Sequence, residues 1–258
     1  MRGEFVDVGG ARLYYYAAGT RGAGDPLVLI HGCLTSSHLW SWIIQCLPEG
    51  HRTVIVDLLG HGRSDPPDGR SLTVRAHADR LVALLDALGI EQACLVGHGL
   101  GATIARLVDA SRVSRLALLN TVSPGRRLPM PLRSARHLPA PLLLRLVRSR
   151  ITSGYCDAER ASRSLDHYMR PFVVPGGHAV IAEQLAAIAG DKSVVEAPIN
   201  VPSAIIAGVN DPFVSVDEAK ALQGAIPGAT LEILPDAHYA PEESPERVAQ
   251  VITQLLER

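Results

Sequence analysis

The sequence lacks the features that mark a secreted, membrane-spanning or zinc-binding protein. It has only 4 cysteines in 258 residues. They are scattered without C-x-x-C spacing, which argues against a zinc site and against a disulfide framework. The first residues contain no apolar signal segment, and no apolar run is long enough to cross a bilayer. We therefore expect a protein of the reducing cytoplasm with no membrane partner.

An excess of charge of either sign is also missing. The chain has 25 Lys and Arg residues against 26 Asp and Glu residues, for a formal net charge of −1. This balance gives no electrostatic basis for nucleic-acid binding. Dinucleotide and P-loop fingerprints are absent, as is any His, Cys or Asp cluster with metal-ligand spacing. We expect no cofactor and no metal, and the sequence does not predict the oligomeric state.

Strand and helix patterns alternate along most of the chain. Short apolar runs typical of strands occur at 5–8, 11–17, 26–30, 53–57, 94–97, 116–120, 203–207 and 230–234. Helical patterns follow at 73–88, 100–109, 216–225 and 245–256. This order predicts an α/β fold with a doubly wound, mostly parallel sheet. The length suits one such domain with an insertion.

The pattern changes between residues 123 and 198. Prolines and arginines are frequent there, strand alternation is missing, and 142–147 and 179–189 have helical patterns. We interpret this segment as a helical cap, inserted between a first core part at 1–122 and a second at 199–258. Its arginines are expected on a solvated outer face, with an apolar inner side.

Distinctive motifs follow four of the expected strands. Ligands in open α/β sheets bind beyond the carboxyl ends of the strands, so these motifs are expected to meet at one site. They are His31-Gly32-Cys33, Gly97-His98-Gly99, Asp211 and His238.

With these motifs the chain resembles the α/β-hydrolase superfamily over its whole length, in particular capped esterases, C–C hydrolases and lactonases. The resemblance also includes the segment from Asp57 to Ser64, Gly208-x-x-Asp211-Pro212, and Glu243-x-Pro245 after the histidine. The family's nucleophile elbow reads G-x-S-x-G. In this sequence the central position is Gly99.

The resemblance implies the roles of the remaining parts. The family order of nucleophile, acid and histidine falls on Gly99, Asp211 and His238. A carboxylate bonded to one imidazole nitrogen fixes the tautomer and leaves the other nitrogen as a general base. The backbone N–H groups of Cys33 and Leu100 are expected to form the oxyanion hole.

Four further residues are candidate substrate contacts around this site: Trp40, Ser37, His98 and Tyr239. Trp40, Cys33 and the Ser36-Ser37 pair are expected to line one cavity. Histidine at the elbow more often has a structural hydrogen-bonding role in this family. Cys33 is also a candidate nucleophile because it carries a thiol near the oxyanion donors. A small apolar filler is the preferred interpretation of Cys33.

The glycine at position 99 leaves three hypotheses open. In the first, which we favour, His238 activates water or removes a proton next to a carbonyl, giving hydrolysis, elimination, C–C cleavage or cyclisation. Superfamily members with non-serine elbows, among them an aminoacrylate hydrolase-like branch, give a precedent by analogy. The expected substrate is an uncharged or weakly polar carbonyl compound of moderate size. The second hypothesis is a serine esterase inactivated by Ser→Gly, and the third is a non-catalytic ligand-binding protein.

Overall fold

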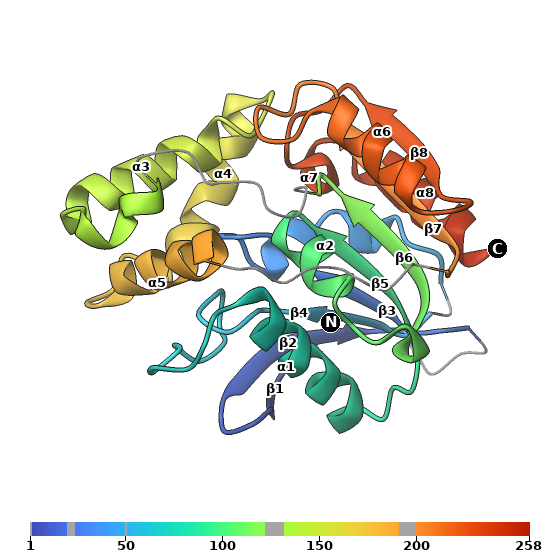
Figure 1. The fold of residues 1–258 in the computed structure, drawn as a ribbon, viewed down its shortest axis with the longest axis horizontal. Helices are drawn as coiled ribbons and strands as arrows, with labels where there is room; N and C mark the ends of the chain where they lie inside the picture. The colour runs from blue at the N-terminus through green and yellow to red at the C-terminus, as the bar shows by residue number, and fades with distance from the viewer. Residues whose placement is uncertain (1, 20–23, 50, 122–131, 191–199) are drawn as a thin grey trace.

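An eight-stranded sheet forms the centre of the computed structural model, which describes residues 2–19, 24–49, 51–121, 132–190 and 200–258 (Figure 1). Its order is β1-β2-β4-β3-β5-β6-β7-β8, with β1–β2 and β2–β4 antiparallel and the other pairs parallel. The strands are β1 (Arg2–Asp7), β2 (Arg12–Ala18), β3 (Leu27–Ile30), β4 (Thr53–Val56), β5 (Ala93–His98), β6 (Val113–Leu119), β7 (Ser203–Gly208) and β8 (Thr230–Leu234). The predicted mostly parallel sheet is confirmed.

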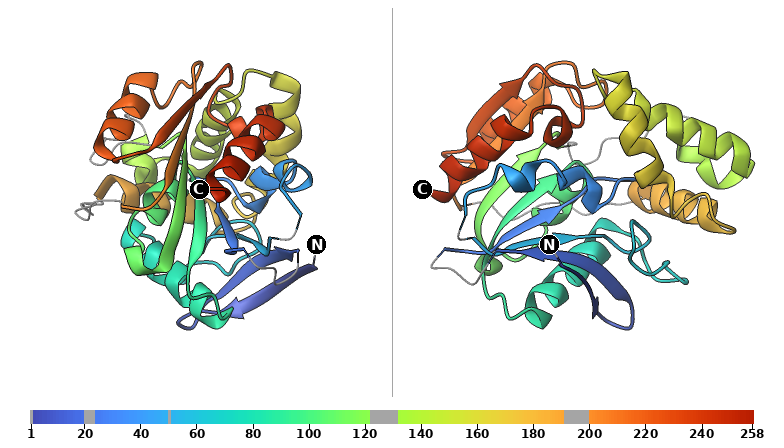
Figure 2. Two further views of the ribbon diagram at one scale, coloured as in Figure 1. Left: turned by 90° about the vertical axis from the view of Figure 1, so that its right-hand side faces the viewer. Right: turned by 180° about the vertical axis from the view of Figure 1, so that it is seen from behind.

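Helices cover both faces of the sheet, as the two views of Figure 2 show. Alternate residues of a strand face opposite sides. Leu27 and Leu29 therefore join one core cluster while Val28 and Ile30 join the other. The first cluster packs against α8 (Pro245–Leu256) and the second against α1 (Val74–Ala87), α2 (Leu100–Ala105) and α6 (Val216–Ala225). The helix predicted at 100–109 ends earlier, because the bonds after Ala105 change to the tighter i→i+3 type.

Three helices between β6 and β7 stand together beyond one end of the sheet (Figure 1). They are α3 (Ala140–Thr152), α4 (Ala158–Met169) and α5 (Gly177–Gly190). The helical patterns noted at 142–147 and 179–189 are confirmed, whereas α4 was not predicted. Its apolar stripe is narrow, but Asp157 caps its start by accepting hydrogen bonds from two backbone N–H groups. The predicted cap boundaries at 122–123 and 198–199 lie outside the described residues.

Other expected absences concern membranes, metals and disulfides. Within the described ranges, no helix has the length and apolar character needed to cross a bilayer. The same ranges contain no group of three His, Cys, Asp or Glu side chains that could hold a metal ion. All four cysteines are free thiols.

Buried histidines on the sheet's carboxyl side act as neutral hydrogen-bonding groups. His31 Nε2 accepts a hydrogen bond from the N–H of Leu58 at 3.0 Å. His77 Nε2 lies 3.1 Å from the amide oxygen of Gln184 in α5, which joins the core to the cap. Burial lowers the pKa of His61 to about 4 and the pKa of His77 to about 3.

We expect these histidines to make the protein sensitive to mild acid. Folding lowers the pKa of these histidines from 6.5. Below pH 6.5 the unfolded chain therefore binds more protons than the folded protein. The stabilisation is complete above pH 6.5 and is lost as the pH falls toward the folded pKa, by about 1.4 kcal/mol per pH unit for each histidine. Urea unfolding at a series of pH values measures this slope. His77→Gln should reduce the slope of the free energy of unfolding against pH by the contribution of about one bound proton. A free energy of unfolding that does not depend on pH would contradict the assignment.

Candidate active site

Strand β5 turns sharply into α2 at Gly99. The backbone there has φ 53° and ψ −112°, a left-handed conformation that glycine adopts with little strain. A Cβ at Gly97 would lie 2.5 Å from the backbone of Ala102, so the helix packs directly on the strand. A Cβ at position 99 would instead lie in ordinary contact, 3.7 Å from Nε2 of His238. Position 99 therefore faces the imidazole with room for a side chain.

His238 and Asp211 form a hydrogen-bonded pair. His238 Nδ1 lies 2.8 Å from Asp211 Oδ2, and the aspartate side chain is fully buried. The two residues follow β8 and β7, so neighbouring parallel strands bring them together at the predicted edge of the sheet. Burial raises the pKa of Asp211, but the hydrogen bond and charge of His238, together with hydrogen bonds from Asn120 and Phe213, outweigh it and keep the pKa below its usual value. The pair is thus arranged to hold one imidazole tautomer.

Asn120, predicted only as the end of a strand, holds the Asp211 side of this pair in place. Its Nδ2 donates to Asp211 Oδ2 at 2.8 Å and to the carbonyl oxygen of Ala237 at 3.2 Å. The backbone N–H groups of Phe213 and Val214 donate to the other carboxylate oxygen. Donors therefore hold both oxygens of Asp211. An amide residue directly after a buried strand was the available signal.

The two expected oxyanion donors border the open position at Gly99. Leu100 is the first residue of α2, so its N–H has no acceptor within the helix. Hydrogen bonds among the described residues use neither this N–H nor that of Cys33. The Cα of Gly32, next to Cys33, would lie 3.8 Å from a Cβ at position 99. Burial raises the pKa of the Cys33 thiol to about 12, which argues against its use as a thiolate nucleophile.

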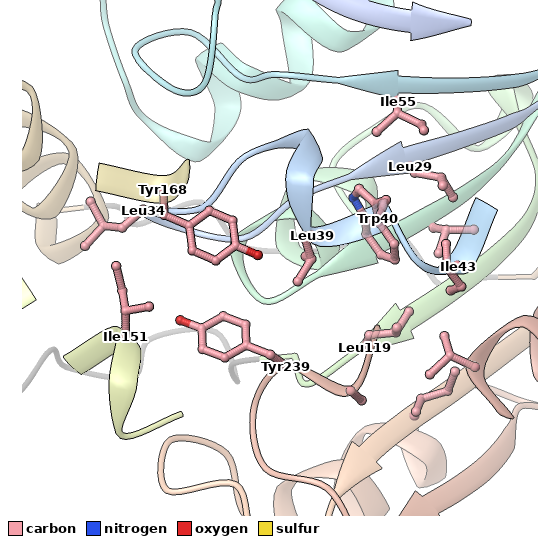
Figure 3. Close-up of a cluster of buried hydrophobic side chains, with 14 of the residues drawn as sticks. Leu29, Leu34, Leu39, Trp40, Ile43, Ile55, Leu119, Ile151, Tyr168 and Tyr239 are labelled. Carbon is pink, nitrogen blue, oxygen red and sulfur yellow. The ribbon is translucent and has the colours of Figure 1, made fainter. Parts of the chain in front are cut away.

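Two expected substrate contacts lie elsewhere. The Trp40 ring is fully buried in the core beside Leu29 (Figure 3), where it fills the space between the sheet and the segment after β3. Ser37 lines a separate hollow of about 380 Å³ together with Asp57 and Arg63, and its N–H donates to Asp57 at 2.6 Å. Neither Gly99 nor His238 lines this hollow. The expectation that Trp40, Cys33 and the Ser36-Ser37 pair share one cavity is therefore wrong.

His98 and Tyr239 pack against the imidazole ring of His238. His98 Nε2 lies 2.8 Å from the carbonyl oxygen of His238 and donates to it. The Tyr239 ring lies 5.1 Å from the His238 ring and 5.7 Å from the His98 ring, by their centroids. Both side chains are buried. They hold the loop that carries His238, and their contact with a substrate stays a prediction.

Arg150 of α3 reaches toward this site from the cap. Its guanidinium carbon lies 3.4 Å from the centroid of the Phe213 ring, which is 4.8 Å from the His238 ring. Its positive charge also acts to lower the pKa of Cys33 and of Tyr239, against the larger effect of burial. The expectation of a solvated outer face is therefore wrong for this arginine. Its place beside the apolar stripe of α3 at Val147 and Ile151 was the only sequence signal.

Comparisons with known proteins agree with this architecture. Residues 25–245 match the model of a family described as alpha/beta hydrolase fold. An uncharacterised protein of Mycobacterium tuberculosis is 26% identical over 98% of this chain and 81% of its own length. A cis-3-alkyl-4-alkyloxetan-2-one decarboxylase of Shewanella oneidensis is 34% identical, over 46% of this chain and 38% of its own. The crystal structure of an enol-lactonase from Burkholderia xenovorans has a TM-score of 0.84 at 24% identity, covering 99% of this chain and all 100% of that one.

Proposed function

This chain belongs to the alpha/beta hydrolase fold family, and on that premise we propose that it is an enzyme acting on a small carbonyl compound without a covalent intermediate. The observation that carries the proposal is the acid–histidine pair facing a glycine. His238 is held by Asp211 at 2.8 Å, while position 99 offers no nucleophilic atom. An imidazole oriented by a buried carboxylate is typical of catalytic sites.

In the proposed hydrolysis, Nε2 of His238 removes a proton from water while the water oxygen attacks the substrate carbonyl. The N–H groups of Cys33 and Leu100 donate to the oxyanion that forms. The imidazolium is stabilised by Asp211 and then returns its proton to the leaving group. If the substrate has an acidic C–H next to the carbonyl, the same base and the same donors support elimination or C–C cleavage.

The second candidate is a serine esterase inactivated by Ser→Gly. It is favoured by the room for a side chain at position 99, where a Cβ meets only ordinary contacts. Similar solved structures include proteins described as an enol-lactonase and an esterase, which fits an ancestral ester-cleaving activity. A pure binding protein is disfavoured because a binding pocket gains no clear benefit from an imidazole held by a buried carboxylate.

Intact-mass spectrometry during turnover tests the proposal. The protein is incubated with a panel of enol lactones, aryl esters and β-keto acids, and products are followed by liquid chromatography. Product formation with an unchanged protein mass is expected for at least one compound class. An acyl adduct on the protein during turnover would contradict the non-covalent mechanism. Binding of panel compounds without any product would favour the ligand-binding hypothesis.

Because the positive charge of Arg150 lies over Phe213 and acts on Cys33, we propose a substrate with a carboxylate group; the uncharged compound expected from the cap composition stays the alternative. We expect Arg150→Met to raise KM at least about tenfold for a carboxylate-bearing substrate and to change little for its neutral ester, because a charged hydrogen bond is lost. Arg145→Met, an exposed position on the same helix, is the matched control. Equal effects of Arg150→Met on acid and ester would refute this role.

A further inference from the structure

A second buried carboxylate lies next to the proposed site. Glu242 is in the short helix α7 (Ala240–Glu243), four residues after His238, and its relative exposure is 0%. It takes no part in the proton transfers described above. A carboxylate in such a place is costly unless hydrogen bonds compensate its lost hydration.

Among the described residues, three hydroxyl groups donate to Glu242, and all of them come from the cap. Tyr155, in the loop between α3 and α4, donates its hydroxyl to Oε1 at 2.8 Å. Ser164 and Tyr168 of α4 also donate their hydroxyls to the two carboxylate oxygens. The latter two are four residues apart and so lie on one face of their helix. Burial raises the pKa of Glu242, and these hydroxyl groups counter the rise more than Arg160 does.

Backbone hydrogen bonds also join the cap to the loop that carries His238. The N–H of His238 donates to the carbonyl oxygen of Gly154 at 2.8 Å. Glu243 accepts hydrogen bonds from the N–H of Cys156 at 2.6 Å and from the N–H of Ala237 at 2.7 Å. A Cβ at Gly154 would come within 2.6 Å of the Tyr239 ring, so only glycine allows this approach. The loop that carries His238 and the cap are thus joined by several hydrogen bonds close to Gly154.

Aromatic rings fill the remaining space between them. Tyr239 stacks on Tyr155 with centroids 4.3 Å apart and on Tyr168 at 6.3 Å. Figure 3 shows Tyr168 and Tyr239 side by side, with Ile151 of α3 next to them. A lifted cap would expose these rings and leave Glu242 without its hydroxyl donors.

We propose that Glu242 is a positioning residue that clamps the cap onto the loop carrying His238, so that cap closure and alignment of the imidazole are one event. This clamp does not depend on which reaction the site performs. Because the test of the clamp uses no substrate, failure of the clamp can be told apart from failure of the proposed function.

Hydrogen exchange measured by mass spectrometry reports on the clamp. In Glu242→Ala, exchange of the segment from Gly154 to Met169 is expected to be at least about tenfold faster, with β3 and β5 unchanged. Glu242→Gln keeps an acceptor oxygen and should have a smaller effect. Glu246→Ala, an exposed position on α8, is the matched control and should leave the cap unchanged. If Glu242→Ala does not fold, Glu242→Gln and Tyr168→Phe decide the question by the same readout.

The coupling to the imidazole is tested by NMR. The proton between His238 Nδ1 and Asp211 is expected to exchange with water at least about tenfold faster in Glu242→Ala than in the parent protein. A loosened cap with an unchanged imidazole proton would overturn the coupling. Unchanged exchange in the cap, or faster exchange spread equally over the sheet, would overturn the clamp itself.

Discussion

Removal of the His238 imidazole is expected to reduce turnover by about a thousandfold or more, because its Nε2 is the proposed base that faces position 99. The Nε2 atom faces the open position, while Nδ1 is occupied by Asp211 at 2.8 Å. His238→Ala is compared with the parent protein on the substrate identified in the panel, by initial rates at saturating concentration. The variant and the parent protein should have similar near-UV circular dichroism, since His238 lies in the loop between β8 and α7.

Two further variants make this result specific. Asp211→Asn should also lower the rate strongly, because the amide disturbs the tautomer and removes the charge that stabilises the imidazolium. Cys33→Ala should stay within about threefold of the parent, because a thiol with a pKa of about 12 contributes no thiolate. Unchanged turnover in His238→Ala would refute the general-base mechanism. A large loss in Cys33→Ala would instead identify the thiol as the nucleophile.

The second large effect is expected from Gly99→Ser. A serine Cβ at this position lies 3.7 Å from His238 Nε2, so its hydroxyl can reach hydrogen-bonding distance of the imidazole. If the N–H groups of Cys33 and Leu100 act as the proposed oxyanion donors, we expect esterase activity against a small aryl ester at least about a hundredfold above that of the parent. Labelling by a fluorophosphonate, detected by intact mass, is expected only in this variant.

Gly99→Ala is the matched control for Gly99→Ser. It places the same Cβ on a backbone with φ 53°, which costs on the order of 1–3 kcal/mol of stability, but it adds no hydroxyl. If the proposed non-covalent mechanism holds, both variants lose the parent reaction, because the new side chain takes the space used by water. A folded Gly99→Ser protein without esterase activity would argue against the inactivated-esterase hypothesis. Full parent activity in Gly99→Ala would refute the use of that space.

Much of the core was predictable because its elements have local causes. Helix α1 begins after Thr73, whose side chain accepts from the N–H of Ala76, and the expected range of 73–88 matches it closely. The fully buried strands β3 and β4 read as short apolar runs. Helix α4 was missed because few of its residues are apolar and its burial depends on packing between cap and core.

The sequence by itself determined the order of the motifs along the chain. With that order it also determined that Asp211, His238 and Gly99 lie close together. Parallel strands place their carboxyl ends at one edge, so residues that follow buried strands meet there whatever lies between them. The expected backbone donors of Cys33 and Leu100 do not depend on side-chain identity, and their role as an oxyanion hole stays a prediction.

Only the tertiary structure decided which distant side chains serve this site. Asn120 meets Asp211 across 91 residues, and Tyr155 meets Glu242 across 87. Such contacts leave no periodic signal, because they depend on how strand ends, loops and the cap pack against one another rather than on any local pattern. The same reason explains why Trp40 lies in the core and Arg150 lies over Phe213. Burial and charge at a site are properties of the packed chain, and no stretch of sequence contains them.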